Sequence, residues 1–368
     1  MKIGLIDADL LDNGTRHPNL ALMKLSGYYK NKGHEVTLLT DYSSIIGYDK
    51  VFVSKVFSFT KFPKEVKRFN NVKCGGSGFY PEGNGPKLAK TIEHHMPDYS
   101  LYEEFIQAEI RKGVKPSRFK DYRDFSIGFM TRGCFRKCEF CINKKYDSVF
   151  RHASVNEFLD PERKYIYLWD DNVLGYAKWY EVFDELRATG KSFQFRQGLD
   201  IRVMTSDKAE VLAKSRYYGD YIFAFDDLAQ KNEVIKGLRI WKKKTGKITK
   251  LYLLCAFKST DLKDIEELFE RIQILMRFQC LPYVMRYENY KNSKFARLYT
   301  HIARWCNQPH IFKKMSFREF CLAHMAYVES GHVPAALRTL NEFEEEYPEV
   351  AKRYVDLKYM HYKDSHEF

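Results

Sequence analysis

Short apolar runs alternate with polar segments throughout the first hundred residues. They predict buried strands at residues 2–6, 35–39, 50–54 and 72–74. The segment 18–31 instead repeats its apolar residues with the period of an amphipathic helix, and it ends at Gly33, a residue typical of helix C-termini. A short helix is expected at 63–69. This alternation of strands and helices predicts a small α/β domain on a parallel sheet.

The same alternation recurs six times from residue 124 to about residue 290. Strands are expected at 125–131, 164–169, 193–197, 221–225, 250–255 and 282–287. Helices are expected between them, notably at 176–189, 207–215, 232–244 and 262–278. Six repeats are two short of a closed eight-stranded barrel. Helical patterns at 294–306, 317–330 and 335–347 then predict a helical C-terminal extension.

These patterns predict four parts of the chain. We expect an α/β domain at 1–100, a linker at 101–123, a partial barrel at 124–290 and the helical extension at 291–368. Proline and glycine already interrupt the chain from about residue 80. The adjacent His94 and His95 suit either a metal site or a packed strap between domains. The strap is favoured, because neighbouring side chains point in different directions and no third ligand is evident.

Composition fits a globular enzyme, with 45% apolar and 30% charged residues among 368. No apolar run reaches the length of a membrane span, and residues 2–6 look like a strand rather than a signal peptide. We therefore expect no membrane association. Eight cysteines without a regular framework favour a reducing, cytoplasmic location.

The formal net charge is +13, which is typical of proteins with anionic partners. The densest basic stretch, 236–250, holds seven Lys or Arg and no acid. It fits a solvated helix face, and it also fits a surface that binds a polyanion such as nucleic acid.

Three cysteines stand close together in the run 133–142. Cys134, Cys138 and Cys141 follow the spacing C-x3-C-x2-C, with Phe140 directly before the last of them. Thiolates this close suit a soft metal centre. No further Cys or His with ligand-like spacing follows, so three protein ligands on a four-iron cluster would leave one iron open. The run also follows the expected strand 125–131, and α/β folds place their chemistry at such strand ends.

This triplet, with its aromatic residue and preceding strand, resembles the signature of the radical S-adenosylmethionine enzymes. The resemblance implies that Cys134, Cys138 and Cys141 hold a 4Fe–4S cluster, whose open iron chelates S-adenosylmethionine beside Phe140. It also implies that one electron, from a reductant such as flavodoxin or ferredoxin, cleaves this cofactor to a 5′-deoxyadenosyl radical. The usual core of the family is an open six-repeat barrel. The fold class expected is therefore α/β: an N-terminal Rossmann-like parallel sheet domain, a partial (βα)6 TIM-type barrel and a helical C-terminal extension.

The first domain resembles, in layout, the cobalamin-binding domain that precedes the barrel in one branch of that superfamily. It lacks the Asp-x-His-x-x-Gly element that supplies a cobalt ligand. The loop 7–19, at the expected ligand edge of the sheet, is rich in polar residues, including Asp7, Asp9 and His17. Such a loop suits a small polar ligand or a substrate tail better than a corrin. Cobalamin is possible but not favoured. The glycine-rich loop 75–78 is either a phosphate cradle or a tight turn.

Polar residues at later strand ends supply candidate cofactor contacts. The resemblance assigns the methionine amino group to Asp170 and Asp171, which also suit a helix cap or a turn. At the next strand end, Gln197 or Asp200 could bind ribose hydroxyls and Arg202 the methionine carboxylate; the rival is an Arg202–Asp200 structural pair. Asp226 follows the fourth strand and is a candidate for facing the cofactor or substrate.

These observations predict a radical S-adenosylmethionine enzyme of unknown substrate, with an anionic molecule and a nucleic acid among the candidates. Rearrangement or epimerisation, cobalamin-dependent methyl transfer, and modification of a nucleotide or peptide all stay open. The alternative of another class is a nucleic-acid-binding module with the triplet as a zinc knot. No Ser-His-Asp set or Walker loop appears, so hydrolysis has no support.

Overall fold

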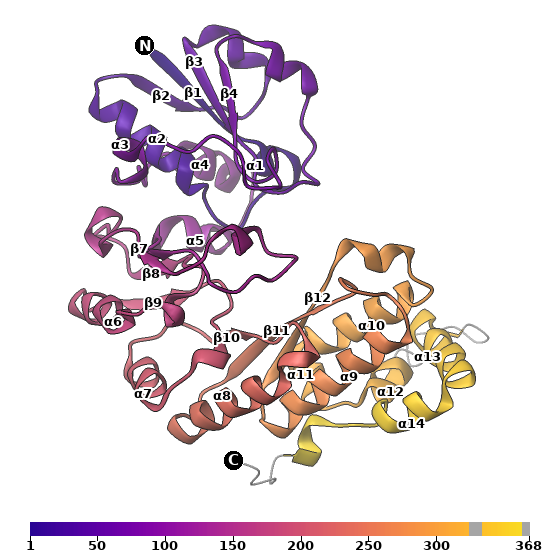
Figure 1. Ribbon diagram of the computed structural model, residues 1–368. Coiled ribbons are helices and arrows are strands. Elements are labelled where there is room, and N and C mark those ends of the chain that lie inside the picture. The colour runs from indigo at the N-terminus through magenta and orange to yellow at the C-terminus, as the bar shows by residue number, and fades with distance from the viewer. Residues whose placement is uncertain (324–332, 363–368) are drawn as a thin grey trace. The chain divides into compact units, whose positions relative to one another are not determined.

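The computed structural model describes residues 1–323 and 333–362 (Figure 1). Contacts divide the chain into two compact units. The first unit comprises 1–171 and 184–193, and the second comprises 172–183 and 194–368. Each is described by itself below. The predicted domain bounds stay a prediction. No helix in the described part of the chain combines the length and the apolar character needed to cross a membrane.

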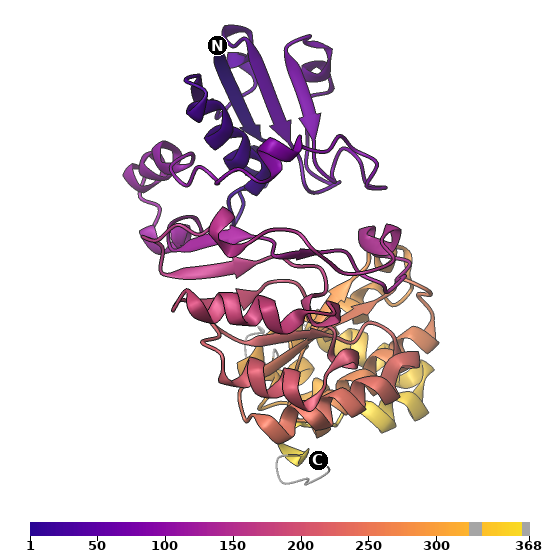
Figure 2. The same cartoon turned by 60° about the vertical axis from the view of Figure 1, so that its left-hand side comes forward.

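The first unit opens with a four-stranded parallel sheet in the order β2-β1-β3-β4, labelled in Figure 1. Figure 2 shows its indigo and purple strands from another side. The strands are β1 (Lys2–Asp7), β2 (Glu35–Leu38), β3 (Lys50–Ser54) and β4 (Val72–Gly75). Helix α1 (Ala8–Asn13) begins directly after β1, and α2 (Leu20–Asn31) leads into β2. Strand order reverses between β1 and β3, which is where open α/β sheets bind ligands. The parallel α/β domain predicted from the sequence is confirmed.

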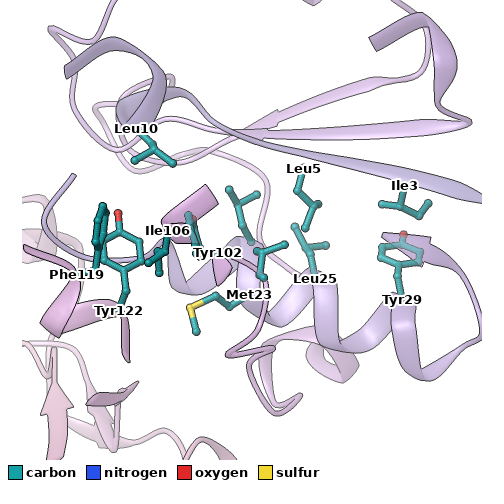
Figure 3. Packing of buried hydrophobic residues seen from close by; sticks show 12 residues of the cluster. Ile3, Leu5, Leu10, Met23, Leu25, Tyr29, Tyr102, Ile106, Phe119 and Tyr122 are labelled. Carbon is teal, nitrogen blue, oxygen red and sulfur yellow. The ribbon is translucent and has the colours of Figure 1, made fainter. Parts of the chain in front are cut away.

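Alternate residues of β1 enter two hydrophobic clusters, as a twofold strand period requires. Ile3 and Leu5 pack against Tyr29 and Leu25 of α2 (Figure 3). Ile6, on the other face, joins a cluster formed largely by β3 and its flanking loops. The sheet is thus covered on both faces, which agrees with its parallel topology.

The segment 101–123, expected to be a linker, contributes to the first of these clusters. It forms α4 (Glu103–Arg111) and α5 (Lys120–Arg123) after the short α3 (Lys90–Glu93). Its buried side chains Tyr102 and Ile106 lie beside the α2 residues in Figure 3. The sequence pattern did not reveal these helices, because proline and glycine flank them closely.

The six predicted barrel strands are all present, in two three-stranded sheets of sequential order. They are β5 (Phe125–Gly128), β8 (Tyr165–Leu168), β9 (Ser192–Phe195), β10 (Tyr221–Ala224), β11 (Thr249–Cys255) and β12 (Leu281–Arg286). The pairs β5–β8, β10–β11 and β11–β12 are parallel. Sequential parallel strands are consistent with the partial barrel.

Helices follow the strands as predicted, with ends within a few residues. They are α6 (Trp179–Ala188), α7 (Ser206–Lys214), α8 (Lys231–Lys244), α9 (Leu262–Arg277) and α10 (Ala296–Cys306). Within the second unit, Trp241 of α8 packs edge-on to Tyr221 and Phe223 of β10. The indole N–H of Trp241 donates to Thr249 Oγ1 at 2.9 Å, which ties α8 to the start of β11.

The C-terminal extension is helical, as predicted. It contains α11 (Pro309–Phe312), α12 (Phe317–Ala323), α13 (Ala335–Glu346) and α14 (Pro348–Tyr354). The predicted helix 317–330 begins as expected, and its part from residue 324 lies outside the described residues. Tyr354 stacks on Phe269 of α9, so the extension packs against the helix that precedes β12.

Candidate functional site

The cysteine triplet lies on a loop whose two ends are paired. β6 (Thr131–Arg132) precedes the cysteines, β7 (Phe150–Arg151) follows them, and the two short strands pair antiparallel. The ladder joins Thr131 to Arg151 and Arg132 to Phe150. The intervening loop, 133–149, is therefore closed at its base. We call it the cysteine loop.

Gly133 fits the entrance of the cysteine loop because it has no side chain. Its φ of +88° lies in the left-handed region, and a Cβ would stand 2.4 Å from the carbonyl oxygen of Ser148. Any other residue would have to displace this backbone and adopt a strained conformation. The glycine therefore brings the two ends of the loop into close contact.

Backbone N–H groups point at two of the three cysteine sulfurs. The N–H of Arg136 donates to Cys134 Sγ, and that of Asn143 donates to Cys141 Sγ, both at 3.4 Å. The Cys141 sulfur also caps a short 3-10 turn, Ile142–Lys145. Such hydrogen bonds stabilise thiolate charge and tune the reduction potential of an iron–sulfur cluster.

The three thiols are near enough to influence one another. Burial raises the pKa of the Cys141 thiol, and Cys138, Cys134 and Asp171 raise it further. Within residues 1–323 and 333–362, no three His, Cys, Asp or Glu side chains converge tightly enough to hold a single metal ion. A four-iron cluster places each thiolate on a different iron, so its ligands surround a cavity rather than one point. Soft thiolate donors on one short loop fit such a cluster.

The other cysteines differ from the triplet. Cys255, Cys280, Cys306 and Cys321 are buried, and burial raises the pKa of each thiol. They are packed as small apolar side chains. The half-buried cysteines are the triplet and Cys74.

Lys137, inside the triplet, braces the cysteine loop. Its Nζ donates to the carbonyl oxygens of Lys144 and Tyr146, at 3.0 and 2.6 Å, and pairs with Asp147 at 2.5 Å. One ammonium group thus joins the middle of the loop to its returning end. Phe140, the aromatic residue of the motif, is 39% exposed.

Asp170 is buried beneath the start of the cysteine loop. Its carboxylate accepts the N–H of Met130 at 3.2 Å, and both the N–H and the hydroxyl of Thr131, at 2.5 and 2.7 Å. Burial raises its pKa to about 6, although these hydrogen bonds oppose the shift. Asp170 therefore joins the end of β8 to the segment between β5 and the cysteines.

Asp171 reaches both sides of the triplet. Oδ2 accepts the N–H of Gly133 at 2.8 Å, and Oδ1 accepts the side-chain amide of Asn143 at 2.7 Å. The structure thus brings the two predicted aspartates to the cysteine loop, where they hold its backbone. Their role toward the methionine amino group stays a prediction. Thr131, Lys137 and Asn143 were missed in the sequence, where nothing but their nearness to the cysteines marks them.

Next to these aspartates, Trp169 supplies a buried donor without an acceptor. Its indole Nε1 has no hydrogen-bond partner among residues 1–323 and 333–362, and its ring lies edge-on to His17 at 5.6 Å. An unsatisfied buried donor at a strand end is uncommon and favours a polar group that binds there.

Four predicted cofactor contacts lie in the second unit. Asp200, 5% exposed, accepts both the N–H of Arg202 at 3.2 Å and its Nε at 2.6 Å, so the rival structural pair is present. Asp226 accepts the N–H of Leu254 at 2.9 Å, and burial raises its pKa despite nearby guanidinium groups. Gln197 is exposed. The cofactor roles of these residues stay predictions.

The predicted ligand loop of the first unit bonds to its own domain. Buried Asp7 caps α1 at the Leu10 N–H, 3.2 Å away, and accepts the Tyr102 hydroxyl at 2.8 Å. Asp9 accepts the N–H of Val56 at 2.6 Å and the hydroxyl of Thr60 at 2.5 Å. The segments that follow β1 and β3 are therefore tied together over the strand ends.

The histidine string is a packed strap, as the sequence favoured. His94 Nδ1 lies 2.7 Å from Glu157 Oε2, and His95 Nε2 lies 2.9 Å from Asn31 Nδ2. Gly27 of α2 lies where a Cβ would stand 2.5 Å from the carbonyl oxygen of Met96, so the strap approaches that helix closely.

Comparisons with known proteins support the fold. No family model matches the chain, and no curated protein does. A solved structure of the radical S-adenosylmethionine methyltransferase TsrM from Kitasatospora setae, with cobalamin and a [4Fe–4S] cluster bound, superposes with a TM-score of 0.50 at 12% identity. The match covers 77% of this chain and 72% of that one.

A second similar protein is SuiB from Streptococcus suis. Its free structure matches with a TM-score of 0.34 at 11% identity, over 56% of this chain and 58% of that one. Its structure bound to the precursor peptide SuiA matches with a TM-score of 0.36 at 11% identity, over 62% and 66%. The similarity to TsrM confirms the α/β fold class expected from the sequence.

Proposed function

We propose that this chain is a radical S-adenosylmethionine enzyme. The proposal rests on the cysteine loop. The β6–β7 ladder closes this loop, and Gly133 allows its two ends to approach closely. Asp170 and Asp171 bind it to the end of β8. Its thiols influence one another electrostatically. The similarity of fold to TsrM supports the same class, because that protein carries a [4Fe–4S] cluster.

Each part of the loop has a proposed task. Cys134, Cys138 and Cys141 hold a 4Fe–4S cluster. When bound, such a cluster passes one electron to S-adenosylmethionine, which releases methionine and a 5′-deoxyadenosyl radical. The N–H groups of Arg136 and Asn143 stabilise charge on two of the sulfurs. Asp170 and Asp171 fix the loop, and Trp169 offers an N–H to a bound polar group.

Anaerobic reconstitution with iron and sulfide tests the proposal. About four irons per chain and formation of 5′-deoxyadenosine under strong reductant are expected. Alanine at the three loop cysteines should abolish both. Cys74→Ala is the matched control, since this half-buried thiol lies outside the loop and should leave both intact. One zinc per chain without sulfide would instead support the zinc-knot alternative, and full cleavage by the triple variant would refute the role of the cysteine loop.

Cobalamin-dependent methyl transfer is the second candidate, because TsrM is a methyltransferase that binds cobalamin. The first unit of this chain fits a corrin poorly. Asp9 bonds to Val56 and Thr60 across the place where strand order reverses, so α1 and the segment after β3 close that edge. We propose that this domain binds no cobalamin and helps to recognise the substrate. Stoichiometric retention of hydroxocobalamin through gel filtration would refute this.

A further inference from the structure

A buried lysine without an acidic partner lies at the end of β3. Lys55 is 9% exposed, and its ammonium lies 5.5 Å from the centre of the Phe79 ring. Lys67 lies over the same ring at 4.6 Å. Neither lysine pairs with a carboxylate among the described residues. Two cations that share one ring, with no carboxylate paired to either, favour a bound anion.

The cations around Lys55 share this lack of partners. Between residues 55 and 90 the only acids are Glu65 and Glu82. Eight Lys and Arg occupy the same segment: Lys55, Lys61, Lys64, Lys67, Arg68, Lys73, Lys87 and Lys90. In the part of the chain that the structure describes, none of them belongs to an ion pair, and all except Lys55 are exposed. We call residues 55–90 the basic segment.

Exposed aromatic rings accompany these cations. Phe57 and Phe59 stack on each other, with centroids 5.2 Å apart and planes 15° from parallel. They are 49% and 72% exposed. Proteins bind single-stranded nucleic acids through aromatic rings that stack on the bases and cations that neutralise the phosphates. The basic segment exposes side chains of both kinds.

The basic segment extends to the cysteine loop. Lys145 Nζ donates to the carbonyl oxygen of Gly83 at 3.1 Å, and a Cβ on Gly83 would stand 3.2 Å from Ile142. Ile142 directly follows the last cysteine of the triplet. A polymer bound along the basic segment would therefore reach the residues next to the proposed cluster.

We propose that the basic segment binds a single-stranded nucleic acid. Lys55 and Lys67 hold a phosphate beside Phe79, the exposed lysines follow the backbone, and Phe57 and Phe59 stack on unpaired bases. We further assign single-stranded nucleic acid as the substrate class, because the basic segment leads to the cysteine loop. This assignment rests on the proposed function. An acidic peptide would leave the stacked rings without a role, and a duplex would hide the bases from them.

The test is fluorescence anisotropy with a labelled 20-nucleotide RNA of mixed sequence, without S-adenosylmethionine or reductant. Binding should weaken as salt rises, with a slope of about −0.7 per phosphate neutralised. Lys64→Ala, Lys67→Ala and Lys73→Ala combined should reduce that slope by about 2. Phe57→Ala with Phe59→Ala should weaken binding about tenfold with the slope unchanged. Both sets of side chains are exposed, so the fold should persist.

Matched variants make the proposal refutable. Lys236→Ala, Arg239→Ala and Lys243→Ala on α8 also remove three exposed, unpaired cations, and they should leave binding nearly unchanged. Ile46→Ala controls for an exposed apolar side chain in the same unit. Equal loss in the α8 variant would overturn the proposal. So would equal affinity for the duplex, competition by polyglutamate, or binding to anionic vesicles but not to RNA. RNA binding without cleavage of S-adenosylmethionine would refute the proposed enzyme activity but would support RNA binding by the basic segment.

Discussion

The carboxylate of Asp171 lies within hydrogen-bond distance of both sides of the cysteine triplet, accepting the Gly133 N–H at 2.8 Å and the Asn143 amide at 2.7 Å. The residue thus joins the end of β8 to the entrance and the exit of the cysteine loop. Asp171 can therefore affect a bound cluster by holding the cysteine loop in place, and an experiment can distinguish this role from direct contact with S-adenosylmethionine.

Asp171→Ala should loosen the cysteine loop. Removing both acceptors leaves two donors unpaired, at a cost of about 1–3 kcal/mol. We expect a faster loss of iron to a chelator under anaerobic conditions. Asp227→Ala is the control, because this strand-end aspartate caps a turn and pairs with Lys258 in the second unit. Weaker S-adenosylmethionine binding with unchanged iron release would instead assign Asp171 to the cofactor.

Gly133→Ala should prevent cluster assembly. The substitution combines left-handed strain with a contact of 2.4 Å to the Ser148 carbonyl oxygen. Iron content per chain after reconstitution should fall severely. Gly14→Ala carries the strain alone, because a Cβ there has open space around it, and it should cost about 1 kcal/mol of stability with iron content unchanged. Equal iron content in both variants would show that the loop does not depend on this approach.

Asp7→Asn should stabilise the protein at pH 8 and not at pH 4. Burial raises the pKa of Asp7 to about 6, against the lowering effect of the Tyr102 hydrogen bond. The folded chain therefore holds this proton more tightly than the unfolded chain does, and stability from this group is lost as pH rises from about 4 through 6. The gain for asparagine, which can still cap α1, is at most about 3 kcal/mol by denaturant unfolding.

A second aspartate provides a control of opposite sign for that experiment. Hydrogen bonds from Ser43 and Ser44 lower the pKa of Asp41, which is exposed. Asp41→Asn should therefore destabilise the protein at neutral pH, and the difference should vanish as pH falls below the ordinary aspartate range. If both substitutions changed the free energy of unfolding in the same direction, burial would not be what disfavours the charged form of Asp7.

Arg202→Ala should unfold the second unit more easily rather than act on a cofactor alone. The Asp200 and Arg202 side chains are only 6% and 10% exposed, so removing the guanidinium takes a close counter-charge from a buried carboxylate, at a cost of about 3 kcal/mol. A double-mutant cycle with Asp200→Asn, followed by denaturant unfolding, should show strong coupling. Additive effects, together with weaker S-adenosylmethionine binding, would support the cofactor role.

The sequence predicted the strands well because each is a short apolar run bounded by turn residues, as at β1 and β11. It missed α1, whose six residues Ala8–Asn13 are too few for a helical period to emerge. It also missed β6 and β7, which are two-residue strands. Such elements are defined by their partners in space, and no local pattern specifies them.

The site was predictable to the extent that its chemistry is local. Three cysteines lie within eight positions of the chain, and their spacing alone indicates a metal-binding site. The tether from Asp171 to Gly133 spans 38 residues, and nothing near either residue indicates the other. The lack of acidic partners for the lysines of the basic segment, within the described part of the chain, depends in the same way on what the fold brings near them.

Closure of the cysteine loop by backbone pairing has a consequence for how the protein matures. In small zinc domains the metal supplies the folding energy, so the apo chain is unfolded. Here the β6–β7 ladder, the two aspartates and Lys137 hold the loop through contacts that involve no thiol. The proposed cluster would therefore bind to a loop that is already folded.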